Sequence, residues 1–466
     1  MQIIIVGGSL SGLLTYIALR NHLASSDPTV SIKIVETAKG PEGLPNGSSS
    51  FSPNAVRSLN LIAPELLPLL RQRGFSGGAI DIQNSLGEVL GEFKAGTKEK
   101  YGDLHQLVIS NDTLRDVLLS LINEDDIQWG KSVTGLFELS SGVQVAYSDG
   151  TTETADLVIG ADGAKSTVKD AIFRGAHPNT FKGTASVGSI IRVADLPTRF
   201  QGHLKAKPAA ITFGKRGFFA YSVNSTLPSA DLFWWSVYFP PSPSTEAPTA
   251  DQAKAQFFHR VEGWKAPFDQ ASGENIYASI LELAFGEDRD MEKQSIEKID
   301  SNSLEAKDLI IQARYSASRL PYFTNNTSAL AKGRIVLLGE AAHVIPPETL
   351  QNVAFTTEDI AVYALLLKHY AEEQGLLSKY RFSPSVFEAT AKGYDSIRVP
   401  RVSRFLKDVG NGLDCESGSE MGWLGEKIRD FAASIFCKVS ECVQDNSFSY
   451  DPKKAVVEYL AKSGCA

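Results

Sequence analysis

The chain opens with a short apolar run, Ile3 to Val6, which leads into the glycine-rich segment Gly7 to Gly12. Apolar residues at helical spacing follow, and a second apolar run lies at Ser31 to Glu36. A short apolar run bounded by turn residues predicts a buried strand, and spacing of three to four predicts a helix that faces a core. Strand, helix and strand in this order predict a βαβ unit with parallel strands.

The middle of the chain has a different pattern. From about Gly183 to Gly286 apolar and polar residues mostly alternate, as in the segments 184–193, 209–213, 218–223 and 231–239. Alternation with a period of two is typical of strands with one buried face. We therefore expect a second, mainly antiparallel sheet domain.

The last third returns to mixed signals. The segment Arg334 to His343 predicts a buried strand followed by a turn, and Thr357 to Glu373 has a helical pattern. The remainder, to Ala466, is also largely helical in pattern. The chain shows no internal repeats.

Composition narrows the class of protein. The 466 residues suffice for two or three domains, and 43% hydrophobic with 21% charged residues is ordinary for a globular protein. The net charge of −8 disfavours nucleic acid or an anionic membrane as the main partner, because both attract basic proteins. No stretch of 18 apolar residues predicts a membrane span. The first apolar run is too short for a signal peptide, so we expect a cytoplasmic protein.

The four cysteines, Cys415, Cys437, Cys442 and Cys465, all lie near the C-terminus. They show no C-x-x-C spacing, and no histidines cluster around them. We therefore predict reduced thiols and no metal site.

The segment Gly7-Gly8-Ser9-Leu10-Ser11-Gly12 stands between the predicted strand and helix, where a G-x-G-x-x-G turn binds a dinucleotide. The N-terminus of the helix would offer N–H groups and a positive dipole end to a pyrophosphate. Glu36, at the end of the second strand, would accept a hydrogen bond from a ribose hydroxyl. The alternative is a glycine-rich turn without a ligand.

Two further segments make the pattern specific. Gly160-Ala161-Asp162-Gly163 follows a predicted strand, and Gly339-Glu340 follows another, ahead of the pair Pro346-Pro347. In this order, with Glu36, these segments resemble the FAD-dependent monooxygenases of the aromatic-hydroxylase type, in their fungal-style branch. The resemblance extends from Met1 to about Arg404.

This resemblance implies an α/β fold. A glutathione-reductase-type FAD-binding domain would carry an inserted, mainly antiparallel β-sheet substrate domain and a C-terminal helical segment. The expected limits are 1–180 for the first part of the FAD-binding domain, 181–304 for the substrate domain, 305–370 for the return segment, and 371–466 for the helical region.

The resemblance also implies which residues bind FAD. The candidates are Gly7, Gly8, Ser9, Leu10, Ser11, Gly12, Glu36, Ser49, Asn111, Asp162, Gly163, Gly339, Glu340 and Val353. Several of them depart from the family pattern. Asn111 stands where the family has Arg, Lys169 replaces another Arg, and Glu340 replaces Asp. Leu350 and Asn352 replace the two glycines of the flavin loop, and Ala354 replaces its Asn.

By the same resemblance, one face of the second sheet would roof a substrate pocket. Candidate pocket residues are Tyr221, Trp235, Tyr238, Pro346 and Leu350. The period of two places Trp234 and Tyr238 on one face of their strand, and Phe233, Trp235 and Phe239 on the other. The alternative for each aromatic residue is ordinary core packing, and for His343 a structural role in its turn.

Two functions from different classes remain. The first is a flavin monooxygenase that uses FAD, with NADPH or NADH as a transient reductant, on an aromatic, polyketide-type or terpenoid-type small molecule of secondary metabolism. The second is a non-redox cyclase, isomerase or pericyclic catalyst that has weakened or lost FAD binding and uses the same cleft for its substrate. A non-catalytic binding protein is a third alternative. No side chain is assigned as catalytic, and the oligomeric state stays open.

Overall fold

The computed structural model describes residues 1–24, 29–226, 230–241, 247–268, 275–286, 309–316, 318–373, 382–410 and 420–464. The limit expected between 304 and 305 lies outside these residues, as do Cys415 and Cys465. Cys437 is a buried free thiol, and Cys442 is an exposed one.

A five-stranded parallel sheet carries the N-terminus. Its order is β18 (Ile335–Leu337), β12 (Leu157–Gly160), β1 (Gln2–Val6), β2 (Ser31–Val35) and β8 (Ile127–Gln128). Strands from both ends of the FAD-binding-type region are therefore neighbours. Because parallel strands end at the same edge of a sheet, the residues after β1, β2, β12 and β18 gather there.

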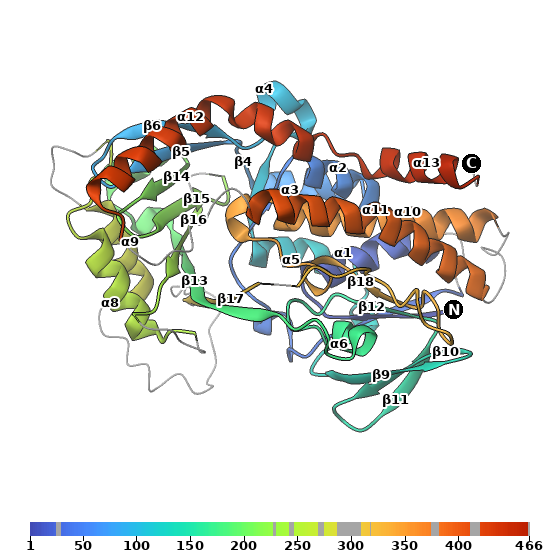
Figure 1. The fold of residues 1–466 in the computed structure, drawn as a ribbon. Helices are drawn as coiled ribbons and strands as arrows, with labels where there is room; N and C mark the ends of the chain where they lie inside the picture. The colour runs from blue at the N-terminus through green and yellow to red at the C-terminus, as the bar shows by residue number, and fades with distance from the viewer. Residues whose placement is uncertain are drawn as a thin grey trace.

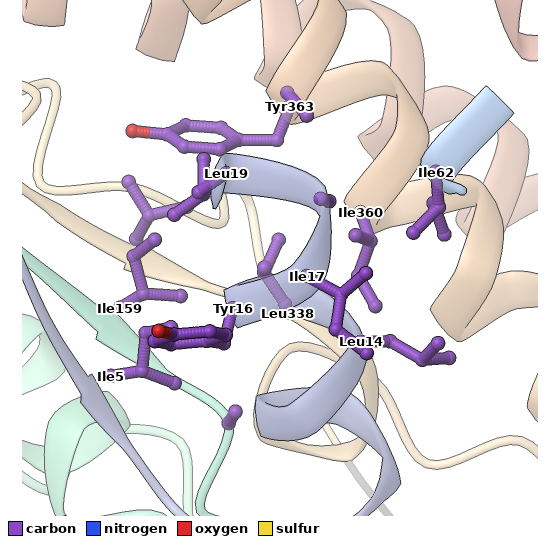
Figure 2. Close-up of a cluster of buried hydrophobic side chains, with 14 of the residues drawn as sticks. Ile5, Leu14, Tyr16, Ile17, Leu19, Ile62, Ile159, Leu338, Ile360 and Tyr363 are labelled. Atoms are coloured by element: carbon purple, nitrogen blue, oxygen red, sulfur yellow. The ribbon is translucent and has the colours of Figure 1, made fainter. Parts of the chain in front are cut away.

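Helix α1 (Leu10–Leu19) packs against this sheet and against α10 (Asn352–Glu373). Ile5, Ile17 and Ile360 are all but completely buried, and Figure 2 shows their side chains in one cluster with Leu14, Tyr16 and Tyr363. Helix α2 (Pro53–Ile62) packs on the same α10. Helix α10, which is buried along most of its length, thus joins the sheet to the helices that cover it.

The second large sheet has seven strands, in the order β17 (Ile310–Ser316), β13 (Thr180–Arg192), β16 (Asp231–Tyr238), β15 (Phe218–Val223), β14 (Ala209–Phe213), β5 (Ala79–Asn84) and β6 (Val89–Lys94). All neighbouring pairs are antiparallel except β14 with β5. One face is covered by α8 (Ala250–Val261) and α9 (Ile276–Phe285). Figure 1 shows this sheet beside the parallel one, with α12 (Trp423–Phe448) running over β5 and β6.

Two three-stranded sheets complete the β structure. One joins β11 (Thr152–Ala155), β10 (Gly142–Tyr147) and β9 (Val133–Leu139), and the other joins β3 (Ser48–Phe51), β7 (Leu107–Ser110) and β4 (Phe75–Ser76). The remaining α-helices are α3 (Leu66–Arg73), α4 (Lys98–Tyr101), α5 (Asn111–Leu119), α6 (Thr167–Phe173), α7 (Thr198–Leu204), α11 (Pro384–Gly410) and α13 (Pro452–Ser463). None of the helices in the described ranges is long and apolar enough to cross a bilayer.

The expected fold class is confirmed: the architecture is α/β, with a mainly antiparallel second sheet and C-terminal helices. The domain limits stay a prediction. The seven-stranded sheet takes β5 and β6 from the first expected segment and β17 from the third, because the chain crosses between the sheets more than once. Helix α10 begins at Asn352 rather than Thr357, since Gln351 accepts the first backbone bond from Phe355.

Candidate functional site

The turn from Gly7 to Gly12 has a shape that only glycine permits. Gly7 has φ +104°, and a Cβ there would lie 2.4 Å from the carbonyl oxygen of Ala161. A Cβ on Gly12 would lie 1.8 Å from the carbonyl oxygen of Gly7. These distances are far inside van der Waals contact, so both glycines are sterically required.

Glu36 is held against this turn. Its Oε2 accepts a hydrogen bond of 2.5 Å from the Gly8 N–H, and its Oε1 accepts one of 2.8 Å from the Ala38 N–H. The carboxylate is therefore fixed at the edge of the parallel sheet beside the start of α1. This is the place in which an acidic side chain binds a ribose in a dinucleotide fold.

Ser9, Leu10 and Ser11 surround the start of α1. Ser9 is exposed, has extended backbone geometry, and makes no side-chain cap to the helix. Leu10 and Ser11 are half-buried, and the first turn carries no acidic residue. The first N–H groups of a helix lack intrahelical partners, so this end is suited to a diphosphate.

Asp162 and Gly163 lie at the end of β12. The Asp162 carboxylate accepts hydrogen bonds from Ser166 Oγ at 2.5 Å and from the Val168 N–H at 3.2 Å. Burial raises the pKa of Asp162, although these hydrogen bonds oppose the shift. Gly163 has φ +74°, and the side where a Cβ would stand is open. Asp162 thus anchors the start of α6, and Gly163 borders open space next to it.

The turn after β18 brings Gly339, Glu340 and α10 together. The Gly339 N–H donates to Asp359 at 3.0 Å, and Glu340 Oε1 accepts from Asn352 Nδ2 at 2.9 Å. The Oδ1 atom of Asn352 is buried without a hydrogen-bond partner. This oxygen lacks a hydrogen-bond donor, and the hydroxyl groups of a ribityl chain are such donors. Glu340 and Asn352 are therefore suited to bind the ribityl part of FAD. Val353, the next residue, is half-buried and packs on the main core.

Ser49 and Asn111 also lie together. Ser49 Oγ donates to Asn111 Oδ1 at 2.7 Å, where β3 meets the start of α5. Arg115 forms an ion pair of 2.5 Å with Asp112.

The flavin loop is built from side chains where the family has glycines. Leu350 has φ +54°, a left-handed conformation that glycine adopts more easily. Its half-buried side chain packs against the cluster of Ile80, Ile82, Ala95 and Cys437. Gln351 is buried, accepts from Asn54 Nδ2 at 3.1 Å, and donates to Ser52 Oγ at 3.2 Å. The loop is thus held by contacts that glycines could not make.

A buried ionic network fixes the helix behind this loop. The sequence allows Arg398 and Arg401 to pair with nearby carboxylates, but it indicates neither which carboxylates these are nor that the pairs are buried. Arg398 donates to Glu358 and to Asp359, each at 2.7 Å, and all three side chains are fully buried. Arg401 adds two bonds of 2.7 Å to Glu358. The available signal was an adjacent acidic pair on one helix and two arginines three residues apart on another.

The network sets the charge of both carboxylates. Burial would raise the pKa of Glu358, but Arg401 and Arg398 bring it below its ordinary value. Burial likewise opposes ionisation of Asp359, whereas His343 and Arg398 lower its pKa. His343 Nε2 lies 2.7 Å from Asp359 Oδ2, so this histidine has the structural role considered for it.

The candidate pocket residues divide between the two faces of the seven-stranded sheet. Tyr221 and Tyr238 pack with α8 and α9 on one face. Trp235 lies on the opposite face, beside Phe218, Val237 and Phe239. Leu350 packs on that same face through Ile82 and Ile80. Pro346 is half-buried at the start of the flavin loop. The two tyrosines therefore point away from the side that Trp235 and Leu350 share.

An open cleft of about 580 Å³ lies elsewhere, where α3 and β4 approach the edge of β5. Its charged lining includes Arg71, which lies 2.5 Å from His105, and Lys207, which lies 2.8 Å from Asp81. None of the predicted cofactor residues lines it, so it is a separate feature.

Comparisons with known proteins agree with the motifs. The chain is 24% identical over 382 residues to the aurachin C monooxygenase/isomerase of Stigmatella aurantiaca. The alignment covers 82% of this chain and 84% of that protein. It is 24% identical over 423 residues to a FAD-dependent monooxygenase of Gibberella moniliformis, covering 87% and 84% of the two chains. No family model matches the sequence.

Solved structures show the same fold. Klebsiella pneumoniae HpxO, complexed with FAD and uric acid, superposes with a TM-score of 0.67 at 16% identity, covering 98% of this chain and 97% of that one. CtdE in complex with FAD superposes with a TM-score of 0.66 at 16% identity, and the match covers 99% of this chain and 98% of that one. In sequence, the chain is similar to FAD-dependent monooxygenases. The resemblance inferred from its motifs is therefore confirmed.

For a monooxygenase relative, the site residues separate into two groups. Gly7, Gly12 and Glu36 adopt the geometry that the turn requires. The loop around Leu350 and Asn352 departs from the family pattern. The roles assigned to individual residues stay predictions, whereas their positions at one edge of the parallel sheet follow from the topology.

Proposed function

We propose that this protein is a FAD-dependent monooxygenase that oxygenates an aromatic, polyketide-type or terpenoid-type small molecule. The observation that carries the proposal is the convergence of three segments at one edge of the parallel sheet: the Gly7 turn, Glu36, and Glu340 with Asn352. A relative named as a FAD-dependent monooxygenase and a structural neighbour solved with FAD support it.

The described residues would hold FAD at several points along its length. The N-terminus of α1 would receive the pyrophosphate, and Glu36 would bind the adenosine ribose. Glu340 and the unpartnered Oδ1 of Asn352 would bind ribityl hydroxyls. Ser49 and Asn111 would contact the same cofactor from β3 and α5.

When bound, FAD supplies the redox chemistry, with NADPH or NADH as reductant and O₂ as the oxygen source. The protein's own residues position the substrate and exclude water. Trp235 stacks on Phe233 with ring centroids 5.6 Å apart, on the sheet face that Leu350 also contacts. This face is apolar and aromatic, which favours a flat or hydrophobic substrate over a charged one.

The first test is the visible absorption spectrum of the purified protein before and after addition of FAD. We expect a flavin spectrum, and NADPH oxidation that accelerates when a substrate of this class is added. A colourless protein that takes up no FAD, yet converts substrate without oxygen, would instead establish the non-redox alternative.

A second test addresses the cofactor residues directly. Asn352→Leu keeps the size of the side chain but removes its Oδ1, so FAD affinity should fall about tenfold, the effect of one lost hydrogen bond. Flavin fluorescence titration measures this without any turnover. Asn446→Leu, at an exposed position of α12, is the matched control and should leave the affinity unchanged. Equal affinities for all three proteins would place Asn352 outside the cofactor site.

A further inference from the structure

Helix α12 carries a long apolar surface that faces solvent. Along this helix, large hydrophobic side chains are between 43% and 72% exposed: Trp423, Leu424, Ile428, Phe431, Ile435, Phe436, Val439 and Val443. We call this set the α12 stripe. Isolated exposed apolar residues are common on proteins, but a row of eight on one helix is not.

Apart from Trp423, the residues of the stripe lie on one face of the helix. Leu424, Ile428, Phe431 and Ile435 follow one another at intervals of four, three and four, the spacing of a helix–helix contact seam. The opposite side of α12 is already occupied, since Cys437 and Ser440 are buried against the β5–β6 side of the sheet. Figure 1 shows α12 at the outer rim of the molecule, and the exposed fractions show that the stripe side chains face solvent.

The size of the stripe matches a protein interface. The exposed fractions, applied to ordinary side-chain areas, give on the order of 900 Å² of apolar surface, above the roughly 300–600 Å² of the largest patch on a typical monomer. A standard interface buries about 800 Å² on each partner. The stripe is therefore large enough to hold a stable partner by itself.

The charges beside the stripe suggest which partner fits. Lys427 lies along one margin near the start of the helix, 3.8 Å from Glu88. Asp445 lies along the same margin near the end of the helix, 2.6 Å from Lys100. An antiparallel pair of α12 helices, with a two-fold axis beside Phe436, brings Lys427 next to Asp445 of the second copy, twice. The same register brings Ile428 to within one position of Val443 of the second copy.

We propose that the α12 stripe is the interface between two copies of this chain, which pair in an antiparallel manner across a two-fold axis near Phe436. A two-fold contact uses the same patch on both copies, so the patch must be complementary to itself, and in this register the charges that meet at its margin are opposite in sign. The net charge of −8 makes an anionic lipid surface a poorer occupant. The inference does not depend on the proposed function.

The mass of the protein in solution tests the proposal. At micromolar concentration, light scattering or sedimentation should give twice the 50.5 kDa of the chain. The double variant Phe431→Glu and Ile435→Glu should give the single-chain mass, because it places charges at the centre of the interface. The dissociation constant of the pair should rise about a hundredfold. Phe137→Glu, at a residue 56% exposed on β9, is the control that should keep the pair.

A cross-link tests the register. In a Cys442→Ser background, Ile435→Cys lies near the proposed axis. Under mild oxidation it should form a disulfide with the same position of the second copy. Leu330→Cys, 60% exposed and far from α12 along the chain, should not. Circular dichroism and thermal unfolding confirm that each variant is folded.

Two results overturn the proposal. One is a single-chain mass for the unaltered protein, and the other is a pair that survives the double glutamate variant. If the single chain sediments with phosphatidylcholine vesicles and the double variant does not, the stripe binds a lipid surface and the second copy is excluded.

Discussion

The two ends of the candidate cofactor site are built in different ways. The turn from Gly7 to Gly12 is defined by backbone contacts so close that no side chain fits. The loop from Pro346 to Ala354 is defined by side chains, with Leu350 in a left-handed conformation and Gln351 hydrogen-bonded to Ser52 and Asn54 at the start of α2. Each leads into the N-terminus of a buried helix, α1 or α10.

The difference explains why one end matches the family and the other does not. At Gly12 any substitution meets the Gly7 carbonyl oxygen, so the sequence there cannot vary without moving the turn. At the loop, the ion pairs of Glu358 and Asp359 fix the start of α10 from behind, so the loop residues themselves can change. Four substitutions and conditions test this contrast.

Arg398→Met should have the largest effect. It leaves Glu358 and Asp359 buried with fewer positive partners, and breaking a buried pair costs about 3–5 kcal/mol. Denaturant unfolding followed by fluorescence measures the loss. Arg192→Met, which breaks the exposed pair with Asp195, should cost less than about 1 kcal/mol. Equal losses for the two variants would show that the network does not anchor the loop.

The same network predicts acid sensitivity. Glu358 and Asp359 have pKa values below their ordinary values of 4.5 and 3.8, so the folded state binds fewer protons than the unfolded state. Their contribution to stability is therefore present above pH 4.5 and is lost as the pH falls through the folded pKa values. The loss should stay smaller than that of Arg398→Met.

Unfolding free energies measured at several pH values check this slope. Asp395 acts in the opposite sense, because burial raises its pKa to about 6. Its ionisation lowers stability as the pH rises from 3.8 to about 6, and Asp395→Asn should remove this loss. A flat profile in the acid range would contradict the ionised state of the network.

Gly12→Ala tests the backbone-defined end. Its Cβ cannot be accommodated without moving the Gly7 carbonyl, and overpacking costs about 1–3 kcal/mol. FAD affinity should fall about ten- to a hundredfold, as measured by calorimetry. Gly202→Ala, where a Cβ meets nothing within 4 Å, is the control. Unchanged affinity would mean that the turn does not bind the cofactor.

Leu350→Gly should have the smallest effect. It relieves a left-handed strain of about 1–2 kcal/mol but loses part of the packing on Ile80 and Ile82, so stability should change little. FAD affinity should rise, since the loop backbone can then approach the flavin. Arg174→Gly, at the other left-handed residue described, should stabilise by about 1 kcal/mol without changing FAD binding. Weaker FAD binding in Leu350→Gly would show that the side chain supports the cofactor.

The glycine turn, Glu36 and the βαβ start could be predicted because their signals are local. Gly12 is fixed by a contact within its own turn, and a period of two placed Trp234 and Trp235 on opposite faces of β16, as the packing shows. The contact that requires Gly7 comes from Ala161, which is far away in the chain. The prediction of Tyr221 and Tyr238 as pocket residues rested on which face of the sheet is covered. That depends on α8 and α9, which no local pattern reveals.

The sequence by itself determined the α/β class, the βαβ start and the three turns that follow parallel strands, because apolar spacing and glycine geometry act over a few residues. Only the tertiary structure decided that Arg398 would neutralise Glu358 and Asp359, 40 and 39 positions away. It also decided that the apolar row of α12 would face outward. Long-range pairing and burial depend on how helices pack on sheets, and a chain's local pattern does not specify that packing.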